Sequence, residues 1–358
     1  MSALHVKGLL WIGVIMVFHS CQTESEENEI IMNDSSARGA FILPDVHDPS
    51  QLVFKDNKYH FVASGLESWY LEEGASNWTF AGEPLDENKP SWYNGTNRFW
   101  APALIESDLG DLWTYFSAVE DEDSHQSKIG FGTLIDASDD ILLENEQTYV
   151  LSSQSITDAF AIDPSVFRAK DEGMWLVFGS HGAGIYTVEL NPSTGYLKET
   201  PGEKAFDSTD SRFFHVADYG GGLNENNVEA AYIFNHPTND YYYLFVNWDV
   251  CCNGVNSTYN IRVGRSQNPE GPYLDKEGNN MASGGGSLFI DSNGEILDDS
   301  RFIGPGHSGI CQKADGSFIF SHHFYDGNNE GMPSMAFWSL GWEQDWPVIQ
   351  TTEPLLFW

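Results

Sequence analysis

The sequence predicts an all-β protein, a five-bladed β-propeller, on two observations. First, one unit occurs five times in 358 residues: a short strand, a polar turn and a second strand rich in aromatic residues. Such a hairpin cannot bury its faces alone, so repeated copies at long spacing indicate an array. Second, aromatic residues make up 14% of the chain and glycine occurs 34 times. No segment carries the sustained apolar stripe of an amphipathic helix, which favours short strands joined by glycine turns.

Each unit begins with a short segment just before its first strand. In the first unit, Asp48-Pro49 leads through residues 52–54 and a turn at 55–58 to the strand that begins at Tyr59. The other four units keep this order. Their starting residues, together with the first, are Asp48, Ala101, Asp163, Glu229 and His307. If each unit starts the innermost strand of a blade, these five side chains meet at one end of the central channel.

The blades are expected to follow one another without a linker, so residues 38–358 form one domain. The first blade covers 41–98, and the next four start near Phe99, Ala161, Val228 and Gly304. Residues 198–225, polar with interspersed aromatics, are predicted to be a long loop near the site. The final Pro354-Leu355-Leu356-Phe357 is expected to pair back to the first blade and close the ring.

The N-terminus predicts export and anchoring. Residues 1–21 have a basic start at Lys7 and an apolar core over 8–18, too short for a comfortable membrane span. A cysteine, Cys21, directly follows and resembles the lipidated residue of a bacterial lipoprotein signal. Residues 22–37 are acidic and polar, typical of a disordered tether. We therefore expect a cell-envelope lipoprotein, at the outer membrane or cell surface, whose folded domain contacts the membrane only through that anchor.

The charge of the chain argues against a nucleic-acid partner, and its cysteine count argues against a disulfide framework. The formal net charge is −36, with 17 basic against 53 acidic residues, so nucleic acid is not an expected partner. Besides Cys21 the chain has Cys251, Cys252 and Cys311, an odd number that is not a disulfide framework. We expect buried thiols, with a strained disulfide between Cys251 and Cys252 as the alternative, and we expect the domain to be a monomer.

Three of the five starting residues are carboxylates. A single Asp at a strand start is usually a cap or turn residue, but Asp48, Asp163 and Glu229 would converge on one channel mouth. Clustered carboxylates repel, which raises the pKa of one group and leaves another low. An acid and a base of this kind are what glycoside hydrolysis needs. Trp100, directly before the second unit's start, could supply the flat apolar platform on which a sugar stacks, or could be a core residue.

At this point several segments resemble glycoside hydrolase family 43, and in particular its endo-α-1,5-L-arabinanases. The most specific is the run from Phe245 to Ser266, with Asp249-Val250-Cys251-Cys252-Asn253-Gly254 and Ser257-Thr258-Tyr259 within it. The others are Val46-His47-Asp48-Pro49-Ser50, Phe99-Trp100-Ala101-Pro102, Ala161-Ile162-Asp163-Pro164-Ser165, Val228-Glu229-Ala230, Gly304-Pro305-Gly306-His307 and Ser321-His322-His323-Phe324-Tyr325-Asp326. The resemblance covers nearly all of residues 41–345.

The resemblance implies a five-bladed propeller that hydrolyses arabinan or arabino-oligosaccharides with inversion. Asp48 would be the general base that activates water, and Glu229 the general acid that protonates the leaving oxygen. Asp163 would hold Glu229 in place and raise its pKa. His307 would lie on the axis and help to hold a calcium ion, largely through water. His47 and Trp100 would contact the substrate.

The sequence departs from the arabinanase pattern at three places, none of which removes a carboxylate. Ala103 stands where an Asp is usual, Ala231 where a Pro is usual, and His181-Gly182-Ala183-Gly184 where aromatic residues are usual. The last departure could thin a sugar-stacking wall. Two alternatives therefore stay open: an exo-acting α-L-arabinofuranosidase or β-xylosidase of the same family, and a non-catalytic glycan-binding propeller. The second predicts loss of at least one carboxylate.

Overall fold

The computed structural model describes residues 41–83, 89–95, 99–120, 126–137, 140–144, 148–199, 205–220, 226–292, 300–350 and 355, with backbone only at 135–137 and 140–144. The predicted signal (1–21) and tether (22–37) lie outside these residues, so both stay predictions. No helix in the described part of the chain is long and apolar enough to cross a membrane.

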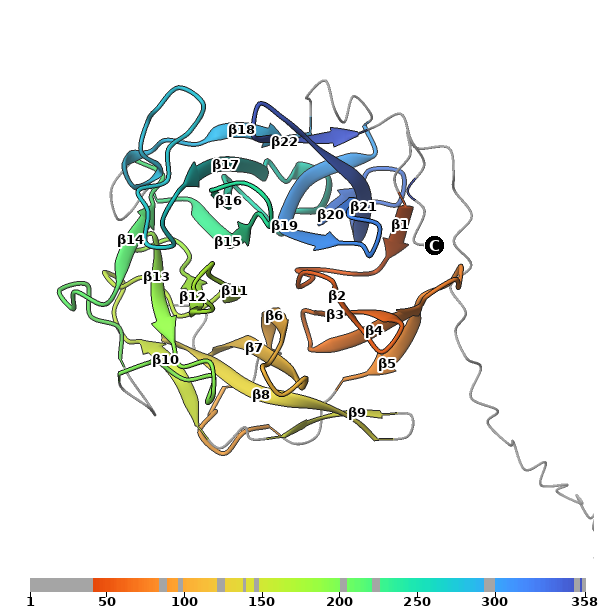
Figure 1. Ribbon diagram of the computed structural model, residues 1–358, viewed down its shortest axis with the longest axis horizontal. Helices are drawn as coiled ribbons and strands as arrows, with labels where there is room; N and C mark the ends of the chain where they lie inside the picture. The colour runs from red at the N-terminus through yellow and green to blue at the C-terminus, as the bar shows by residue number, and fades with distance from the viewer. Residues whose placement is uncertain are drawn as a thin grey trace, which may run out of the picture.

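Five antiparallel sheets surround a central axis, which confirms the predicted five-bladed propeller (Figure 1). The first sheet is β2 (Val53–Lys55), β3 (Lys58–Ala63), β4 (Glu67–Glu72) and β5 (Thr79–Gly82). The second is β6 (Trp100–Glu106), β7 (Leu112–Val119), β8 (Ser127–Ala137) and β10 (Tyr149–Ser153), with β9 (Asp140–Glu144) also on β8. The third is β11 (Ser165–Arg168), β12 (Met174–Phe178), β13 (Ile185–Leu190) and β14 (Phe214–Ala217).

The fourth sheet is β15 (Val228–Asn235), β16 (Tyr242–Trp248), β17 (Asn260–Ser266) and β18 (Ser287–Ile290). The fifth is β19 (Phe302–Gln312), β20 (Phe318–Asp326), β21 (Met332–Glu343) and β1 (Phe41–Pro44), with β22 (Trp346–Gln350) also on β21. Two single-turn 3₁₀ helices, η1 (Gly254–Asn256) and η2 (Met281–Ser283), lie in loops of the fourth repeat. The innermost strands are β2, β6, β11, β15 and β19, as the repeat predicted (Figure 1).

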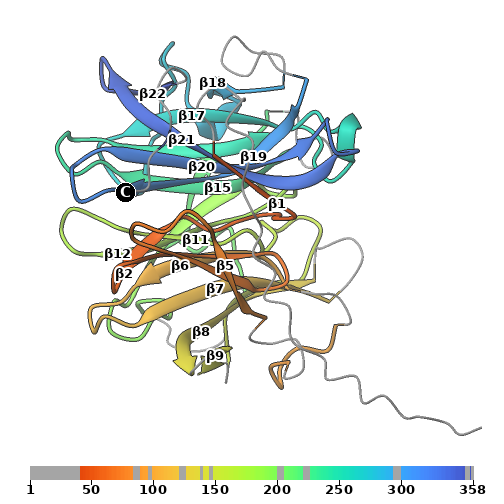
Figure 2. The same cartoon turned by 90° about the vertical axis from the view of Figure 1, so that its right-hand side faces the viewer.

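The ring is closed by the N-terminal strand. β1 pairs with β21 from Phe41 opposite Phe337 to Pro44 opposite Ser334, on the side where the first and last sheets meet (Figure 2). The expected first blade, 41–98, is therefore wrong at its start, because residues 41–44 complete the fifth sheet. Of the residues expected to close the ring, 354–357, only Leu355 is described. It is buried in the core cluster that also contains Leu43.

The core lies between neighbouring sheets. One apolar cluster joins the first and second sheets, another the second and third, another the third and fourth, another the fourth and fifth, and another the fifth and first. The last of these includes Trp78 of the first repeat stacked on Phe337 of β21, with ring centres 5.4 Å apart. Flat sheet faces covered with aromatic residues can pack this way around the whole ring, which buries both faces of each blade.

The described part of segment 198–225 contributes a strand and two core side chains to the third blade. Residues 214–217 form β14, the outer strand of the third sheet, and Phe206 and Phe213 are buried in the core between the second and third sheets. None of residues 205–220 lines the cleft at the channel mouth. Residues 205–213 and 218–220 form a loop, as expected, but the expectation that it lies near the site is wrong for these residues, because Phe206 and Phe213 pack into the core instead. Residues 200–204 and 221–225 lie outside the described part.

Candidate active site

Each innermost strand is preceded or entered, at an equivalent position, by a non-glycine residue in the left-handed backbone conformation. These residues are Asp48 (φ 48°), Ala101 (φ 42°), Asp163 (φ 52°), Ala230 (φ 52°) and His307 (φ 55°). Non-glycine residues pay roughly 1–3 kcal/mol for sparsely populated backbone conformations, which persist mainly at functional sites. In β6, β15 and β19 the left-handed residue lies at a register shift against the next strand. Such bulges re-aim side chains, here toward the channel mouth.

The register corrects the sequence analysis in the fourth repeat. Glu229 was expected to be equivalent to Asp48 and Asp163, but the left-handed residue there is Ala230. Glu229 precedes it and pairs with Asn247, as Trp100 precedes Ala101 and pairs with Ser117. The catalytic candidates therefore come from two different positions of the repeat.

The start of an inner strand is held by a hydrogen bond to the preceding blade. The backbone N–H of Ala101 donates to Ser64 Oγ (3.1 Å) and that of Asp163 to Ser117 Oγ (2.9 Å). Each acceptor belongs to the preceding blade. In the fourth blade the pattern changes: the N–H of Ala230 donates to Asp163 Oδ2 at 3.1 Å.

By analogy with Ser64 and Ser117, Ser180 would accept the N–H of Ala230. Because Asp163 accepts that N–H instead, the hydroxyl of Ser180 can bond Glu229. This hydroxyl donates to Glu229 Oε2 at 2.7 Å. Asp163 thus holds the backbone of the strand that carries Glu229, and Ser180 holds the carboxyl itself. Ser64 and Ser180 were not identified from sequence, although each follows the aromatic strand of its unit and the spacing could have identified them.

Asp48 is surrounded by imidazoles. His47 Nδ1 lies 2.8 Å from Asp48 Oδ2, His323 Nδ1 lies 3.3 Å from Oδ1, and His307 Nε2 lies 3.6 Å from Oδ1. The hydroxyl of Ser64 donates to Oδ2 at 2.8 Å. Burial alone would raise the pKa of Asp48, but His47 and His307 outweigh it and hold that pKa well below its ordinary value. Asp48 is therefore an ionised carboxylate at neutral pH.

The imidazoles around Asp48 differ in charge. Burial alone would lower the pKa of His47, but the Asp48 carboxylate raises it to about 10. Burial and the neighbouring His47 lower the pKa of His323 to about 3. His47 Nε2 also contacts the hydroxyl of Tyr325 at 2.9 Å. Because both ring nitrogens of His47 have protein partners, its expected contact with substrate would come from ring carbon atoms.

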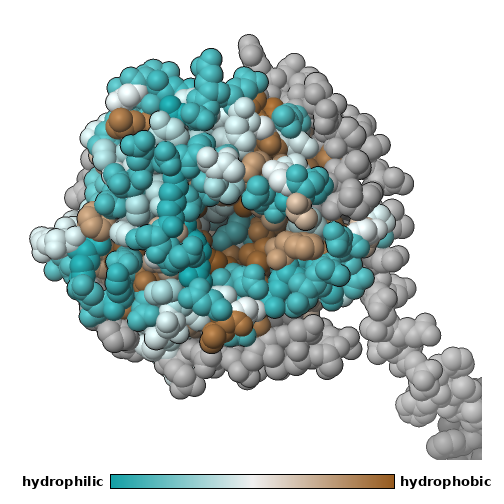
Figure 3. Space-filling view, viewed as in Figure 1, coloured by the Kyte–Doolittle hydropathy of each residue, from teal (hydrophilic) through white to brown (hydrophobic). Residues whose placement is uncertain are grey.

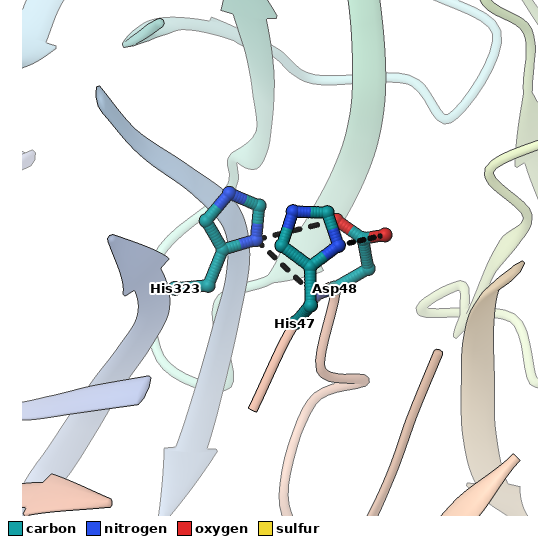
Figure 4. Close-up of side chains that lie close together, drawn as sticks. All are labelled: His47, Asp48 and His323. Atoms are coloured by element: carbon teal, nitrogen blue, oxygen red, sulfur yellow. Dashed lines mark hydrogen bonds and ion pairs between the residues drawn. The ribbon is translucent and has the colours of Figure 1, made fainter. Parts of the chain in front are cut away.

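His47, Asp48 and His323 offer three ligand atoms within 4.8 Å of one another (Figure 4). The two rings are stacked, with centres 4.5 Å apart and planes 18° apart. Ligand lone pairs lie in the ring plane, so those of parallel rings do not converge on one ion. His323 Nδ1 also accepts the backbone N–H of Asp48 at 3.2 Å. The cluster is better described as an orienting frame for Asp48 than as a metal centre.

Asp163 is the carboxyl whose environment opposes ionisation. Burial raises its pKa well above the ordinary value, and the charges of Glu229 and Asp48 raise it further, against the N–H of Ala230. The expected repulsion among converging carboxylates is thus present. Asp48 and Asp163, the same residue type, have pKa values shifted in opposite directions, as acid–base sites require.

A cleft of about 710 Å³ at the channel mouth brings all the candidates together. Figure 3 shows the opposite end of the channel, where the ring face is hollowed and apolar and polar surface lie side by side. The six residues expected from sequence all line the cleft: His47, Asp48, Trp100, Asp163, Glu229 and His307. Trp100 is half-buried and packs against Val119, Phe160 and Ile162. One side of its ring system is thus supported by the core while the residue faces the cleft.

Comparison with known proteins agrees with this geometry. The family model for glycosyl hydrolases family 43 matches residues 41–347. The chain belongs to glycosyl hydrolases family 43. An extracellular endo-α-(1→5)-L-arabinanase of Bacillus subtilis is 32% identical over 318 residues, which covers 84% of this chain and 87% of that relative. An extracellular exo-α-(1→5)-L-arabinofuranosidase of Cellvibrio japonicus is 31% identical over 319 residues, covering 86% and 87%.

Solved structures give the same family. An exo-1,5-α-L-arabinanase from a bovine ruminal metagenomic library has a TM-score of 0.71 at 31% identity, covering 86% of this chain and 97% of that one. A family 43 endo-arabinanase from Bacillus licheniformis has a TM-score of 0.69 at 31% identity, covering 85% and 97%. The relatives thus include both endo- and exo-acting enzymes.

Two cysteines of this family 43 chain lie at its cleft. Cys251 and Cys252 both line it, Cys251 half-buried and Cys252 exposed, whereas Cys311 is buried elsewhere. The expectation of buried thiols is therefore wrong for Cys252. All three thiols are free in this structure. The backbone N–H of Cys252 donates to the hydroxyl of Tyr325 at 2.7 Å, which links this turn to His47.

Behind the cleft lies a small axial cavity of about 20 Å³. Asp163 and His307 line both spaces. The hydroxyls of Ser165 and Ser308 also line the cavity, and within the described part of the chain neither buried oxygen has a hydrogen-bond partner. A cavity of this size accepts one water or one ion, and its unpaired oxygens suit a hard cation such as calcium.

Proposed function

We propose that this chain is an exported glycoside hydrolase that cleaves α-1,5-linked L-arabinan with inversion. The observation that carries the proposal is the convergence of Asp48, Asp163 and Glu229 on one cleft beside Trp100. The arabinan specificity rests on the relatives, which are named for arabinan-degrading activities.

In the proposed reaction Asp48 is the general base. It is ionised, and His47 and Ser64 each contact Oδ2, which orients the carboxylate. Asp48 would accept a proton from the water that attacks the anomeric carbon, on the face opposite the leaving group. An inverting enzyme keeps its two carboxyls about 6.5–9.5 Å apart to leave room for this water.

Glu229 is the proposed general acid. Its carboxyl would protonate the leaving oxygen of the next arabinose as the glycosidic bond breaks. Asp163 accepts the N–H of Ala230, the residue after Glu229, and would keep the acid in place as its pKa modulator. Trp100 would provide the apolar platform for a sugar ring, and His47 would contact the substrate through its ring edge.

Calcium is the proposed ion of the axial cavity. His307 and the hydroxyls of Ser165 and Ser308 would contact it directly, because a cavity of about 20 Å³ accepts one ion or one water, not both. Its positive charge would stabilise the carboxylates gathered around the channel. Removal of calcium by a chelator is expected to lower the melting temperature and the activity together, and calcium alone among added divalent ions should restore both.

We propose that Cys21 is lipidated and that residues 22–37 tether a monomeric catalytic domain at the cell envelope. The relatives named extracellular support export. Incorporation of labelled palmitate into the full chain, and its loss in Cys21→Ser, tests the anchor.

The product profile of residues 38–358 on debranched linear arabinan, with calcium present, tests the proposed function. Short oligosaccharides early in the reaction, with a fast fall in viscosity, would support endo action. Arabinose released from chain ends would support the exo-acting alternative, for which the relatives give a specific reason. Release of xylose from xylo-oligosaccharides instead would make the chain a β-xylosidase. No product from arabinan or from xylo-oligosaccharides would favour the alternative of a non-catalytic glycan-binding propeller.

A further inference from the structure

His181 lies beside the proposed acid. It follows Ser180 just after β12, has a left-handed backbone (φ 50°), and its N–H donates to the carbonyl of Val228 at 2.9 Å. This bond ties it to the residue before Glu229. Its Nε2 lies 3.5 Å from Glu229 Oε2, and it lines the cleft with 44% of its side chain exposed.

The other ring nitrogen fixes the protonation pattern. His181 Nδ1 lies 3.0 Å from the backbone carbonyl oxygen of Asn226. A carbonyl can only accept, so Nδ1 must carry a hydrogen. Nε2 is then either a bare lone pair or, in the cation, an N–H directed at Glu229. An ionised carboxylate and a bare Nε2 would repel each other. A single proton, held either by Glu229 or by Nε2, removes this repulsion.

We propose that His181 returns a proton to Glu229 after each cleavage. This inference rests on the proposed role of Glu229 as the acid. The separation of 3.5 Å is long for a hydrogen bond, but catalytic hydrogen bonds are often long before substrate binds. Ser180 also donates to this oxygen, Oε2, at 2.7 Å, which holds the carboxyl beside the imidazole.

The protons balance over one cycle. As the glycosidic C–O bond breaks, its electron pair goes to the leaving oxygen, which takes the proton of Glu229. While Glu229 holds the shared proton, Nε2 of His181 is a bare lone pair. After cleavage Nε2 takes a proton from bulk water at its exposed edge and gives it to the ionised Glu229, and the bonding pair stays on Nε2. His181 keeps its Nδ1 hydrogen on Asn226 throughout. Asp48 releases to solvent the proton that it took from the attacking water.

Several charged groups lie near His181, and their contacts indicate which of them exchanges a proton with it. Glu229, on β15, is the carboxylate that Nε2 faces. On the flanking segments, Asp158 accepts the backbone N–H groups of residues 154 and 155, and His215 pairs with Asp218 at 3.8 Å. Among these groups, Glu229 is the one whose carboxyl oxygen Nε2 of His181 approaches, at 3.5 Å.

The test compares two substrates with His181→Asn, chosen because Asn tolerates a left-handed backbone well. On α-1,5-linked arabino-oligosaccharides, whose leaving group needs a proton, kcat should fall about tenfold or more with KM nearly unchanged. On the 4-nitrophenyl glycoside of the same oligosaccharide, the leaving phenolate needs no proton, and kcat should be unchanged. Imidazole buffer should restore the lost kcat, because a small diffusible acid can replace the missing side chain.

Matched controls separate this role from a structural one. His60→Asn, on β3 and outside the cleft, should match the wild type on both substrates. His181→Phe, which keeps the ring bulk, should repeat the result and decides it if the Asn variant does not fold. Wild-type kcat in a folded variant, equal losses on both substrates, or no response to imidazole would each overturn the inference. If the wild type itself cleaves no arabino-oligosaccharide, the proposed function fails instead.

Discussion

At the scale of single residues, side chains of one type have different tasks. The charge of Asp48 is stabilised by His47 and by the hydroxyl of Ser64, whereas Asp163 faces two other carboxylates in a buried position. Sequence identified both residues and their neighbours His47 and His307. It could not identify His323 as a partner of Asp48, because that contact joins residues 275 positions apart.

Glu229→Gln tests the acid. The amide keeps the size of the side chain but cannot supply a proton, so kcat on arabinan should fall about 10²- to 10⁴-fold. Binding of an arabino-oligosaccharide, measured by calorimetry, should be largely intact. Glu189→Gln, on β13 and outside the cleft, is the matched control and should keep full activity. Near-normal turnover of arabinan by the Glu229 variant would remove Glu229 from the acid role.

His47 predicts a dependence of stability on pH. Its pKa is raised to about 10, so its ion pair with Asp48 stabilises the fold fully below the unfolded value of about 6.5. That contribution is lost as pH rises to about 10. Hydrogen bonds to charged groups contribute about 1.5–3 kcal/mol, so the unfolding free energy of His47→Asn should be lower than wild type by this order at pH 6.

The difference in unfolding free energy between the wild type and His47→Asn should shrink as pH rises from about 6.5 to about 10. Cys252 has the opposite slope, because the hydrogen bond from Cys251 and the nearby His47 lower its pKa to about 6, against burial. Denaturant titrations should therefore be made in a Cys252→Ser background for both proteins. A difference that grows from pH 7 to pH 10 would contradict the assigned ion pair.

At the scale of elements, the repeated strand start organises the site. The starting residue expected from the repeat is the left-handed residue in the first, second, third and fifth blades, and it lies one position before the left-handed residue in the fourth. The reason is chemical: Glu229 resembles the other carboxylates, whereas the equivalent residue, Ala230, carries no functional group. Backbone conformation, with φ near 50°, marks the true register.

Ala230 offers a test of this element. A β-branched side chain is strained in the left-handed region, so Ala230→Val should lose about 1–3 kcal/mol of stability. Because Asp163 bonds the N–H of residue 230, activity should fall as well. Ala230→Gly should keep activity, since glycine adopts this conformation freely. Equal melting temperatures and equal kcat for the Val and Gly variants would show that the strand start is not under this constraint.

At the scale of the whole molecule, the number of blades was predictable and the closure was not. The five units are long and aromatic, but β1 is a four-residue strand, and its partner Phe337 lies at the far end of the chain. A short apolar segment can pair with any free sheet edge, so only the folded ring shows which one. The site follows from the ring, because the cleft is lined from all five repeats.

Leu43 tests the closure. It is fully buried in β1, between the fifth and first sheets, so Leu43→Ala should cost about 2–5 kcal/mol of unfolding free energy. Leu288→Ala makes the same change at a side chain that is 46% exposed, and should cost far less. Denaturant unfolding measures both. Equal effects would mean that β1 does not close the ring in solution.

The configuration of the first product tests the central claim, that Asp48 and Glu229 act as base and acid across one cleft. Arabino-oligosaccharides are hydrolysed in an NMR tube, and the anomeric signal of the new reducing end is followed before mutarotation. The account predicts that the α-linkage first yields the β-anomer, as attack by water on the opposite face requires. An α-anomer formed first would mean retention, with a carboxylate acting as nucleophile, and would contradict the role of Asp48.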